Sequence, residues 1–365
     1  MKQMTIEGPN AAVGQAALAT PSPAAPSRGW RQPAVGFQLL YLALAAIGLW
    51  LMARALPHDI TLHAFGREKH VHDLGTLVAR NLVVPALILP IMFVIETIFV
   101  GWEHSSLKDL LGEHATTMRS DIVLFILVRA TPVYNFLQLV LTLGFSELSG
   151  EAVRSWLRTS AGVDLSLMWM PLPMALLAYL TVHTFCDYWG HRLQHTRLLW
   201  PIHRFHHSAE EFSLITADRI HPGDFSTIFF SVFLVGLFQV PGVIYVGYAV
   251  VLSFLRLTIH SRIDTDFGWV GRYLVLSPGH HRAHHVADES KSGSNFGLIP
   301  LWDVLFGTLR PAVSRDTPIG VDHPYRHGYW VFSDMLRDSR DFFRGFLPRA
   351  APLPSRGLGV TRSPN

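Results

Sequence analysis

Histidine is the residue type whose number and spacing point most directly to chemistry in this sequence. The chain has 20 histidines, and twelve of them fall between residues 183 and 285. Eight stand in three short groups: His191 and His195 in DYWGHRLQH, His203, His206 and His207 in HRFHH, and His281, His284 and His285 in HRAHH. Residues three and four apart share one face of a helix. The spacing in each group therefore predicts that its imidazoles are neighbours on one face of a helix.

A metal centre explains this pattern better than packing does. A solitary histidine is most often a hydrogen-bonded or solvent-facing side chain. Clustered imidazoles would repel one another if protonated, whereas a metal ion binds the neutral ring directly. Eight imidazoles exceed the roughly four to six ligands that one ion accepts, so the pattern predicts two metal ions. Imidazole serves zinc, iron, copper and nickel alike, and ligand type alone leaves the metal open.

The other potential ligands are few. The only cysteine, Cys186, excludes a disulfide or a cysteine-based zinc or iron–sulfur site within the chain. No HExxH motif of a zinc hydrolase occurs. The carboxylates close to the histidine groups are Asp187, Glu210, Glu211, Asp218 and Asp288. A zinc hydrolase and a structural zinc site are therefore disfavoured.

Composition indicates a membrane protein. Hydrophobic residues make up 49% of the chain and charged residues only 16%, which is typical of proteins with several membrane spans. The formal charge of +3 is small, and Lys and Arg are spread over many segments. This distribution gives no support to nucleic-acid binding.

The fold class expected is all-α: a polytopic membrane helical bundle with a cytosolic helical cap that carries the histidine-rich dimetal site. A span requires about 20 apolar residues. The candidates are residues 35–56, 81–101, 121–145, 165–185 and the block 225–259. Arg129, Asn135 and Gln138 interrupt 121–145, which we interpret as a span buried in the bundle, with an interfacial helix as the alternative.

Four regions follow from this reading. Residues 1–34 are rich in Ala, Pro, Ser and Gly and are expected to form a disordered tail without a cleaved signal peptide. Residues 35–160 are expected to hold N-terminal transmembrane helices and loops, residues 161–310 the catalytic region with the histidine groups, and residues 311–365 a C-terminal tail.

The apolar block 225–259 decides whether the histidine groups can meet. Pro241-Gly242 interrupts it and predicts two helices that enter and return. Segments 186–224 and 260–310 would then lie on the same side of the membrane. Arginines in both segments place that side in the cytoplasm by the positive-inside tendency.

At these residues the chain resembles the fatty acid hydroxylase/sterol desaturase superfamily, whose members are membrane di-iron oxidases with histidine boxes of the forms HxxxH, HxxHH and HxxHH. The resemblance runs from about residue 176 to 309. It includes RIHP at 219–222, NFG at 295–297 and LWDVLFGT at 301–308. All three boxes occur in order.

The resemblance implies roles for individual residues. The eight box histidines and His260 would be iron ligands, and His221 would be a ligand or a support for one. Metal-bound imidazole commonly donates its second N–H to a carboxylate or carbonyl, and Asp187 is the candidate for that task. Asp303 is expected to hold the terminal segment in place. His280 points away from His281 on a helix and is left out.

The implied function is that of a membrane-bound non-haem di-iron oxidoreductase, which uses two Fe²⁺ ions and O₂ to hydroxylate or desaturate a C–H bond in a lipid. Sterols, fatty acyl chains, carotenoids and ether lipids all remain open as substrates. The sequence has no GxGxxG motif and no haem or iron–sulfur attachment sequence. An external electron donor is therefore expected: a reductase, a cytochrome or a ferredoxin.

Three alternatives belong to other classes. A metal-binding membrane protein such as a zinc transporter would place ligands and carboxylates near the bilayer midplane, whereas the expected spans hold few acidic residues. A membrane cytochrome would use single histidines deep within facing spans. A metal store would bind ions without oxidising a lipid.

Overall fold

The computed structural model describes residues 32–56, 59–64, 67–72, 84–112, 116–130, 145–224, 226–288 and 293–346. Within these ranges the chain is helical except for one antiparallel hairpin, in which β1 (Asp59–Ala64) pairs with β2 (Arg67–His72). The all-α expectation is therefore confirmed apart from this two-stranded sheet. Its β-branched residues Ile60, Thr61 and Val71 favour the extended conformation.

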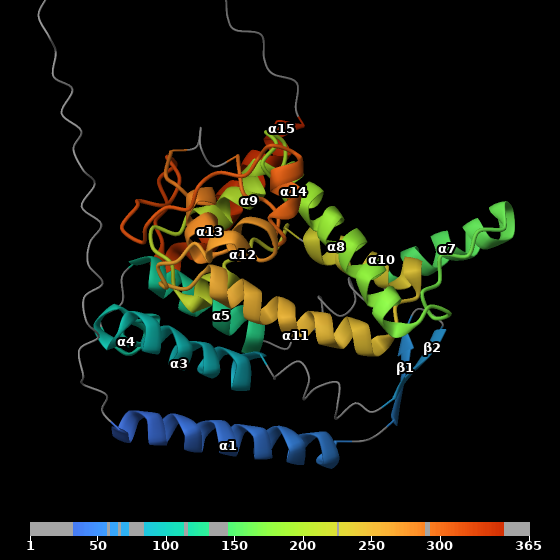
Figure 1. The fold of residues 1–365 in the computed structure, drawn as a ribbon, viewed down its shortest axis with the longest axis horizontal. Coiled ribbons are helices and arrows are strands. Elements are labelled where there is room, and N and C mark those ends of the chain that lie inside the picture. The colour runs from blue at the N-terminus through green and yellow to red at the C-terminus, as the bar shows by residue number, and fades with distance from the viewer. Residues whose placement is uncertain are drawn as a thin grey trace, which may run out of the picture. The chain divides into compact units, whose positions relative to one another are not determined.

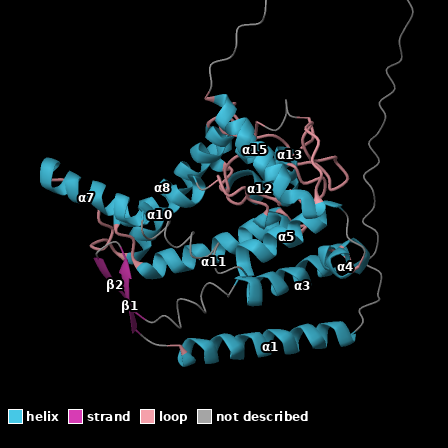
Figure 2. Ribbon diagram, turned by 180° about the vertical axis from the view of Figure 1, so that it is seen from behind, coloured by secondary structure: helices cyan, strands magenta, loops and turns pink. Residues whose placement is uncertain are grey.

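The N-terminal part supplies a layer of helices below the histidine region. It contains α1 (Gln32–Ala55), the π-helix η1 (Val84–Ile88), α3 (Leu89–Val100), the 3-10 helix η2 (Trp102–His104), α4 (Ser106–Leu111) and α5 (Thr116–Ala130). Figures 1 and 2 show α1, α3 and α11 side by side, and α3 contacts both of the others. Phe93 of α3 and Met118 of α5 are buried in the same core cluster.

Four longer helices follow. They are α7 (Leu148–Ala161), α8 (Leu172–Gln194), α10 (Ser226–Phe238) and α11 (Gly242–Ile259). α10 contacts α7 and α8 (Figure 1). α10 and α7 approach so closely that a Cβ added at Gly150 or Gly236 would lie 2.1 Å from a backbone oxygen of the other helix.

Shorter helices hold the second and third histidine boxes and close the site. They are α9 (Trp200–His207), the 3-10 helix η4 (Leu214–Asp218), α12 (Gly268–Tyr273), α13 (Pro278–His284), α14 (Leu301–Leu305), the 3-10 helix η5 (Gly328–Trp330) and α15 (Val331–Gly345). α15 packs on α9 through Met335 and Phe205. This helix lies in the segment expected as a C-terminal tail.

The predicted break at Pro241-Gly242 is confirmed. α10 ends at Phe238 and α11 begins at Gly242 with Pro241 as its N-cap, because proline favours a position just before or within the first helical turn. His221 precedes α10 and its ring lies near Phe205 of α9, and His260 follows α11 and its ring lies near His206 of α9. The two helices therefore leave the site and return to it.

The other span predictions agree with the structure in part. α1 covers nearly all of 35–56, and η1 with α3 covers the described part of 81–101. The range 165–185 was wrong at its start, because α8 begins only at Leu172, after Pro171 and with Pro173 in its first turn. α5 covers 121–130, and residues 131–144 lie outside the described ranges.

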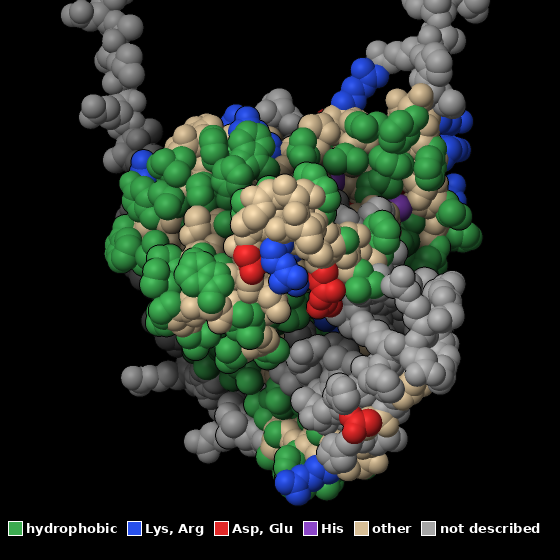
Figure 3. All heavy atoms as spheres, turned by 90° about the vertical axis from the view of Figure 1, so that its right-hand side faces the viewer, with side chains coloured by type: hydrophobic (Ala, Val, Ile, Leu, Met, Phe, Trp, Pro, Cys, Tyr) green, Lys and Arg blue, Asp and Glu red, His purple; other side chains and the backbone are tan. Residues whose placement is uncertain are grey.

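One described helix, Gly242–Ile259, is long and apolar enough to cross a membrane, and Leu40–Ala55 and Ala86–Val100 are shorter apolar helices. Large apolar side chains are also exposed at the end that holds α7 and the start of α8. Figure 3 shows hydrophobic side chains over much of the described surface on that side. They include Trp156, Trp169 and Leu177, which are 62%, 68% and 68% exposed.

Candidate metal centre

Nine histidines converge from four helices. α8 supplies His191 and His195 near its C-terminal end, α9 carries the second box, His260 caps α11, and α13 carries the third box. α13 begins where the Ser277 side chain accepts a hydrogen bond from the backbone N–H of His280, with Pro278 in the first turn. The sequence therefore fixes the start of this helix and the direction of its histidines.

The nine imidazoles form two groups. Group one consists of His191, His195, His203, His207 and His284, and group two of His206, His260, His281 and His285. Within each group, one nitrogen from every ring lies within 4.8 Å of the corresponding nitrogens of the others. Six of the nine residues are buried, and His191, His195 and His206 are half-buried.

Each three-histidine box contributes to both groups. In the second box, His203 and His207 belong to group one and His206 to group two. In the third box, His281 and His285 belong to group two and His284 to group one. The i and i+4 residues thus point to one group and the i+3 residue to the other, so the boxes do not form the single three-ligand faces that their spacing suggested.

The two groups adjoin. The ring of His207 in group one stacks on that of His285 in group two, with centroids 4.0 Å apart and planes 14° from parallel. Among the described residues, neither ring nitrogen of His207 or of His285 has a hydrogen-bond partner. Buried polar atoms are nearly always satisfied, so these nitrogens indicate a ligand between them.

Hydrogen bonds fix the tautomers in group one. Nδ1 of His191 lies 2.7 Å from the Phe296 carbonyl oxygen, and Nδ1 of His203 lies 3.2 Å from Oδ2 of Asp224. Because these oxygens only accept, each Nδ1 carries a proton and each Nε2 presents a lone pair. The two Nε2 atoms are nevertheless 3.1 Å apart. Two facing lone pairs repel each other unless a cation lies beside both.

Group two repeats this arrangement. Nδ1 of His206 donates to the Arg219 carbonyl oxygen over 3.1 Å, and Nδ1 of His260 donates to the Arg256 carbonyl oxygen over 2.7 Å. Their Nε2 atoms lie 3.4 Å apart, and Nε2 of His281 lies 3.1 Å from that of His260. With metal–nitrogen bonds of about 2.1 Å, two ligands of one ion stand roughly 3.0 to 3.4 Å apart.

Protonation does not resolve the repulsion between these lone pairs. Burial lowers the pKa of His191 to about 3, helped by the neighbouring His203, and lowers the pKa of His260 to about 4. The pKa values of His195, His206, His207, His281, His284 and His285 also lie well below the ordinary value, chiefly because of burial. These eight rings are therefore neutral near pH 7, and the donor set of the two groups fits two metal ions.

Two carboxylates orient group one. Asp224 accepts from His203 directly. Burial alone would raise the pKa of Asp224, but the hydrogen bond from His203 and the nearby histidines His203, His191 and His221 together lower it. Asp303, which is fully buried, accepts the backbone N–H groups of Phe296 and Gly297, and the Phe296 carbonyl in turn accepts from His191. The sequence analysis missed Asp224, although it follows directly after His221-Pro222-Gly223.

The remaining site candidates lie outside both groups. His221 accepts the Gly223 N–H on Nδ1, and its Nε2 lies 3.0 Å from the Met335 carbonyl oxygen of α15. Asp187 accepts from the Leu298 backbone N–H and lies near Arg256. His280 pairs with the Ser277 hydroxyl. Hydrogen bonds of the described residues thus connect His221 to the C-terminal helix and Asp187 to the segment after the third box.

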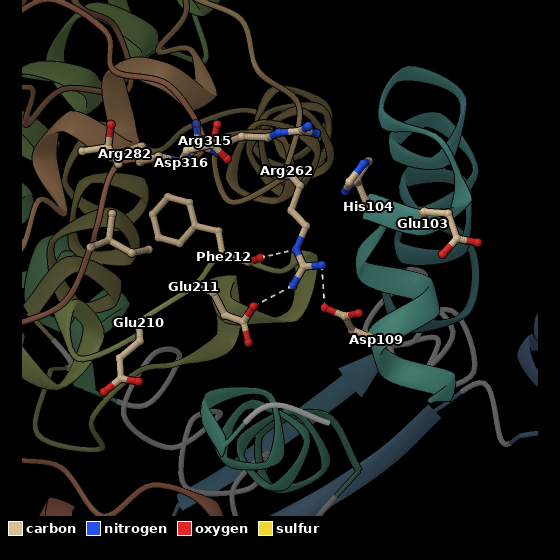
Figure 4. Close-up of a pocket in the computed structure, with 12 residues that line it drawn as sticks. Glu103, His104, Asp109, Glu210, Glu211, Phe212, Arg262, Arg282, Arg315 and Asp316 are labelled. Atoms are coloured by element: carbon tan, nitrogen blue, oxygen red, sulfur yellow. Dashed lines mark hydrogen bonds and ion pairs between the residues drawn. The ribbon is translucent and has the colours of Figure 1, made fainter. Parts of the chain in front are cut away.

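Phe212 separates group two from a polar pocket of about 310 Å³ (Figure 4). Its ring stacks on His281 with centroids 5.6 Å apart, contacts His285 edge-on and lies tilted against His260. Arg262 closes the pocket from the side, because its guanidinium binds Asp109 and Glu211 and donates to the Phe212 carbonyl (Figure 4). This wall keeps solvent away from the imidazoles.

Fold and site together define a helical protein with two adjoining, largely buried histidine groups that could hold metal ions. Residues 176–308 match the Fatty acid hydroxylase family model. These residues contain all nine histidines, and over them the chain is similar to members of the fatty acid hydroxylase/sterol desaturase superfamily.

Curated relatives match parts of the chain of different lengths. Alkylglycerol monooxygenase of Homo sapiens is 32% identical over 142 residues, which cover 38% of this chain and 31% of that protein. The Danio rerio protein of the same name is 26% identical over 239 residues, covering 62% and 47%. Methylsterol monooxygenase 2-2 of Arabidopsis thaliana is 29% identical over 145 residues, covering 38% and 54%. The chain thus spans about a third to a half of these relatives. No solved structure matches it.

Proposed function

We propose that this protein is a membrane-embedded, non-haem di-iron oxidoreductase that uses O₂ to oxidise a C–H bond of a lipid. The observation that carries the proposal is the arrangement of nine imidazoles in two adjoining groups with Nε2 lone pairs that face one another. Such a donor set serves metal ions and has no use in packing. The similarity to monooxygenases supports iron and O₂ over zinc.

The two groups would hold one ion each. Two iron ions would supply the dioxygen activation that an unreactive C–H bond requires. The protein's own contribution is to keep the rings neutral and oriented through the Phe296, Arg219 and Arg256 carbonyls and the Asp224 carboxylate. Phe212 and Phe296, whose rings lie against the histidines, exclude water from the groups.

Embedding in the bilayer would give a lipid direct access to the site. α11 is long and apolar enough to span, and its C-terminal end leads into His260. α8 exposes apolar side chains near its start and carries His191 and His195 near its end. A hydrocarbon chain lying along these helices would therefore reach the imidazoles without crossing water.

An ether lipid is the first substrate class to test. The similarity to the Danio rerio alkylglycerol monooxygenase extends over 239 residues, whereas the methylsterol monooxygenase matches only 145. Hydroxylation of the carbon beside the ether oxygen would place one atom of O₂ in the lipid and reduce the other to water. The hemiacetal formed would break into a fatty aldehyde and an alcohol. Two electrons and two protons are consumed in each turnover.

The electrons must come from outside the chain, from a reductase, a cytochrome or a ferredoxin. The arginines that flank the boxes favour a cytoplasmic orientation of the site. Carriers that draw electrons from reduced nicotinamide are available on that side. Donor and site would therefore lie on the same face of the membrane.

The proposal is tested on full-length protein purified from membranes of iron-replete cells. Metal analysis should give about two iron ions per chain. Reduced protein supplied with ¹⁸O₂ and an alkylglycerol should release an aldehyde that carries ¹⁸O, detected by mass spectrometry after rapid trapping by reduction. Protein loaded with iron that consumes no O₂ with any ether, sterol or acyl lipid would contradict the proposal. Zinc transport into vesicles would favour the transporter instead.

A further inference from the structure

The orientation of His206 in group two depends on the carbonyl of Arg219. This carbonyl accepts from Nδ1 over 3.1 Å and so directs the lone pair of Nε2 into group two. A backbone carbonyl has no charge to hold a ring by itself, and its direction is set by whatever fixes the residue that bears it. The contacts that hold Arg219 in place therefore determine how precisely the His206 ring is oriented.

Arg219 is held by its own side chain, which is 1% exposed. Nη1 lies 2.7 Å from Oδ1 of Asp121, Nη2 lies 2.9 Å from Nδ1 of His327, and Nε donates to the Ser208 hydroxyl over 3.2 Å. Its guanidinium also lies over the ring of Phe205. Asp121 provides the only carboxylate among these partners and is itself 1% exposed.

Asp121 holds a second point of the same segment. Its Oδ2 accepts from the Thr216 hydroxyl over 2.6 Å, and Thr216 closes the capping box of η4 with Ser213. One carboxylate of α5 thus fixes the segment that leads from η4 to the Arg219 carbonyl. α5 lies before residue 176, outside the part of the chain that matches the family model.

We propose that Asp121 is a positioning residue for group two: through Arg219 it fixes the carbonyl that orients His206, so that a helix from outside the family-matched region completes the metal centre. The two groups would then be supported differently. In group one, the Asp224 carboxylate accepts directly from His203. In group two, the Asp121 carboxylate binds the Arg219 side chain, and the Arg219 carbonyl accepts from His206. This inference rests on the dimetal site of the proposed function.

The consequence is a selective loss of one metal. Residues that orient metal ligands typically contribute about 10- to 100-fold to metal affinity. Asp121→Asn should weaken one of the two binding sites by that factor and leave the other unchanged. The probe is Co²⁺ alone, titrated into metal-free full-length protein and followed by visible absorption, with the number of occupied sites confirmed by metal analysis.

Asp338→Asn is the matched control. Asp338 is fully buried and binds Arg204 over 2.6 Å, but it contacts none of the nine histidines. The Asp338→Asn variant should bind two Co²⁺ ions as the unaltered protein does. Equal weakening in both variants would show a general effect of losing a buried charge and would overturn the proposal.

A double variant, Asp121→Leu with Arg219→Met, removes both charges together, because an apolar pair of similar volume often keeps a fold stable where a single unpaired charge does not. This double variant should fold and should still bind Co²⁺ weakly at one of its two sites. If it regains both sites at full affinity, the ion pair is not needed and the proposal fails.

A thermodynamic cycle assigns the affected group. Adding Asp121→Asn to His206→Ala should change Co²⁺ binding little further, whereas adding it to His195→Ala should remove most of the remaining affinity. Additive losses in both backgrounds would overturn the proposed route through His206. If the unaltered protein binds no Co²⁺ at all, the dimetal function itself fails, which is a different outcome.

Discussion

Nε2 of His191 and Nε2 of His203 lie 3.1 Å apart, although the partners of both Nδ1 atoms require a lone pair on each Nε2. Without a cation, this contact is repulsive in an interior that the imidazoles cannot leave. The free energy of unfolding should therefore depend on bound metal more strongly than for a protein whose ligands lie at the surface.

Metal removal should lower the thermal midpoint. An ion present at about 100 times its Kd stabilises the folded state by about 2.7 kcal/mol, which corresponds to roughly 3 to 4 °C for a chain of this size. Two ions should give about twice that shift. Fluorescence melting in detergent, with and without a chelator, measures it. Identical midpoints in both samples would argue against buried metal ligands.

His284→Ala and His280→Ala form a matched pair on α13. Both residues are buried, but only His284 belongs to a metal-binding group, and His280 pairs with Ser277. His284→Ala should reduce iron content to about one ion per chain and abolish lipid oxidation, because group one loses a ligand. His280→Ala should retain two ions. Loss of iron in both variants would mean that helix folding is being measured.

Asp224→Asn tests the support of group one. The amide keeps the shape of the side chain but removes the charge that the Nδ1–H of His203 faces at 3.2 Å. Affinity for one of the two metals should fall about 10- to 100-fold, measured by competition with a chelator of known affinity. Asp322→Asn, at an exposed position, is the control. Unchanged affinity in the Asp224 variant would show that the carboxylate does not support the ligand.

Phe212→Ala should connect the polar pocket with group two. The ring lies against His260, His281 and His285, and its removal opens a path for water from the pocket. We expect O₂ consumption to exceed lipid oxidation in this variant, because water and its protons then reach the site during turnover. Phe212→Leu fills most of the volume and should remain better coupled. Oxygen electrode traces compared with product yield give the ratio.

The histidine spacing predicted eight members of the two groups and the family resemblance added His260, but neither predicted how the nine divide between the groups. The i and i+4 positions of a helix lie about 40° apart and the i+3 position about 60° to the other side, so a box inserted between two ions serves both. Sequence spacing contains no information about where the second ion lies. The groups that orient the imidazoles were harder to predict than the imidazoles themselves. Phe296, Arg219 and Arg256 act through their backbone carbonyls, so their residue types give no signal in the sequence.

The contribution of the N-terminal half was not predictable from the motifs. Asp121 was assigned to an apolar span interrupted by polar residues, and the structure shows its carboxylate bound to Arg219 and Thr216, 98 and 95 positions along the chain. A charged residue at the start of an apolar helix gives no indication of such a distant partner. The polar residues that interrupt the apolar segment 121–145 did indicate buried partners, because polar residues within a bundle require partners.

Membrane topology provides the last test, because the proposed function needs the pocket side of the site to face the cytoplasm. Glu210 is 70% exposed at this pocket, and Glu151 lies exposed on α7, which contacts the α10 helix. After replacement of Cys186 with Ser, Glu210→Cys should react with an impermeant thiol reagent only when the cytoplasmic face is accessible in oriented vesicles. The arginines beside the boxes favour this orientation. If Glu210→Cys reacts solely from the opposite face, the site lies across the membrane from cytoplasmic electron donors. Labelling of Glu151→Cys is the control for whether the vesicles are intact and oriented. The proposed route of electrons into the dimetal centre would then be wrong, even if the metal ligands are correct.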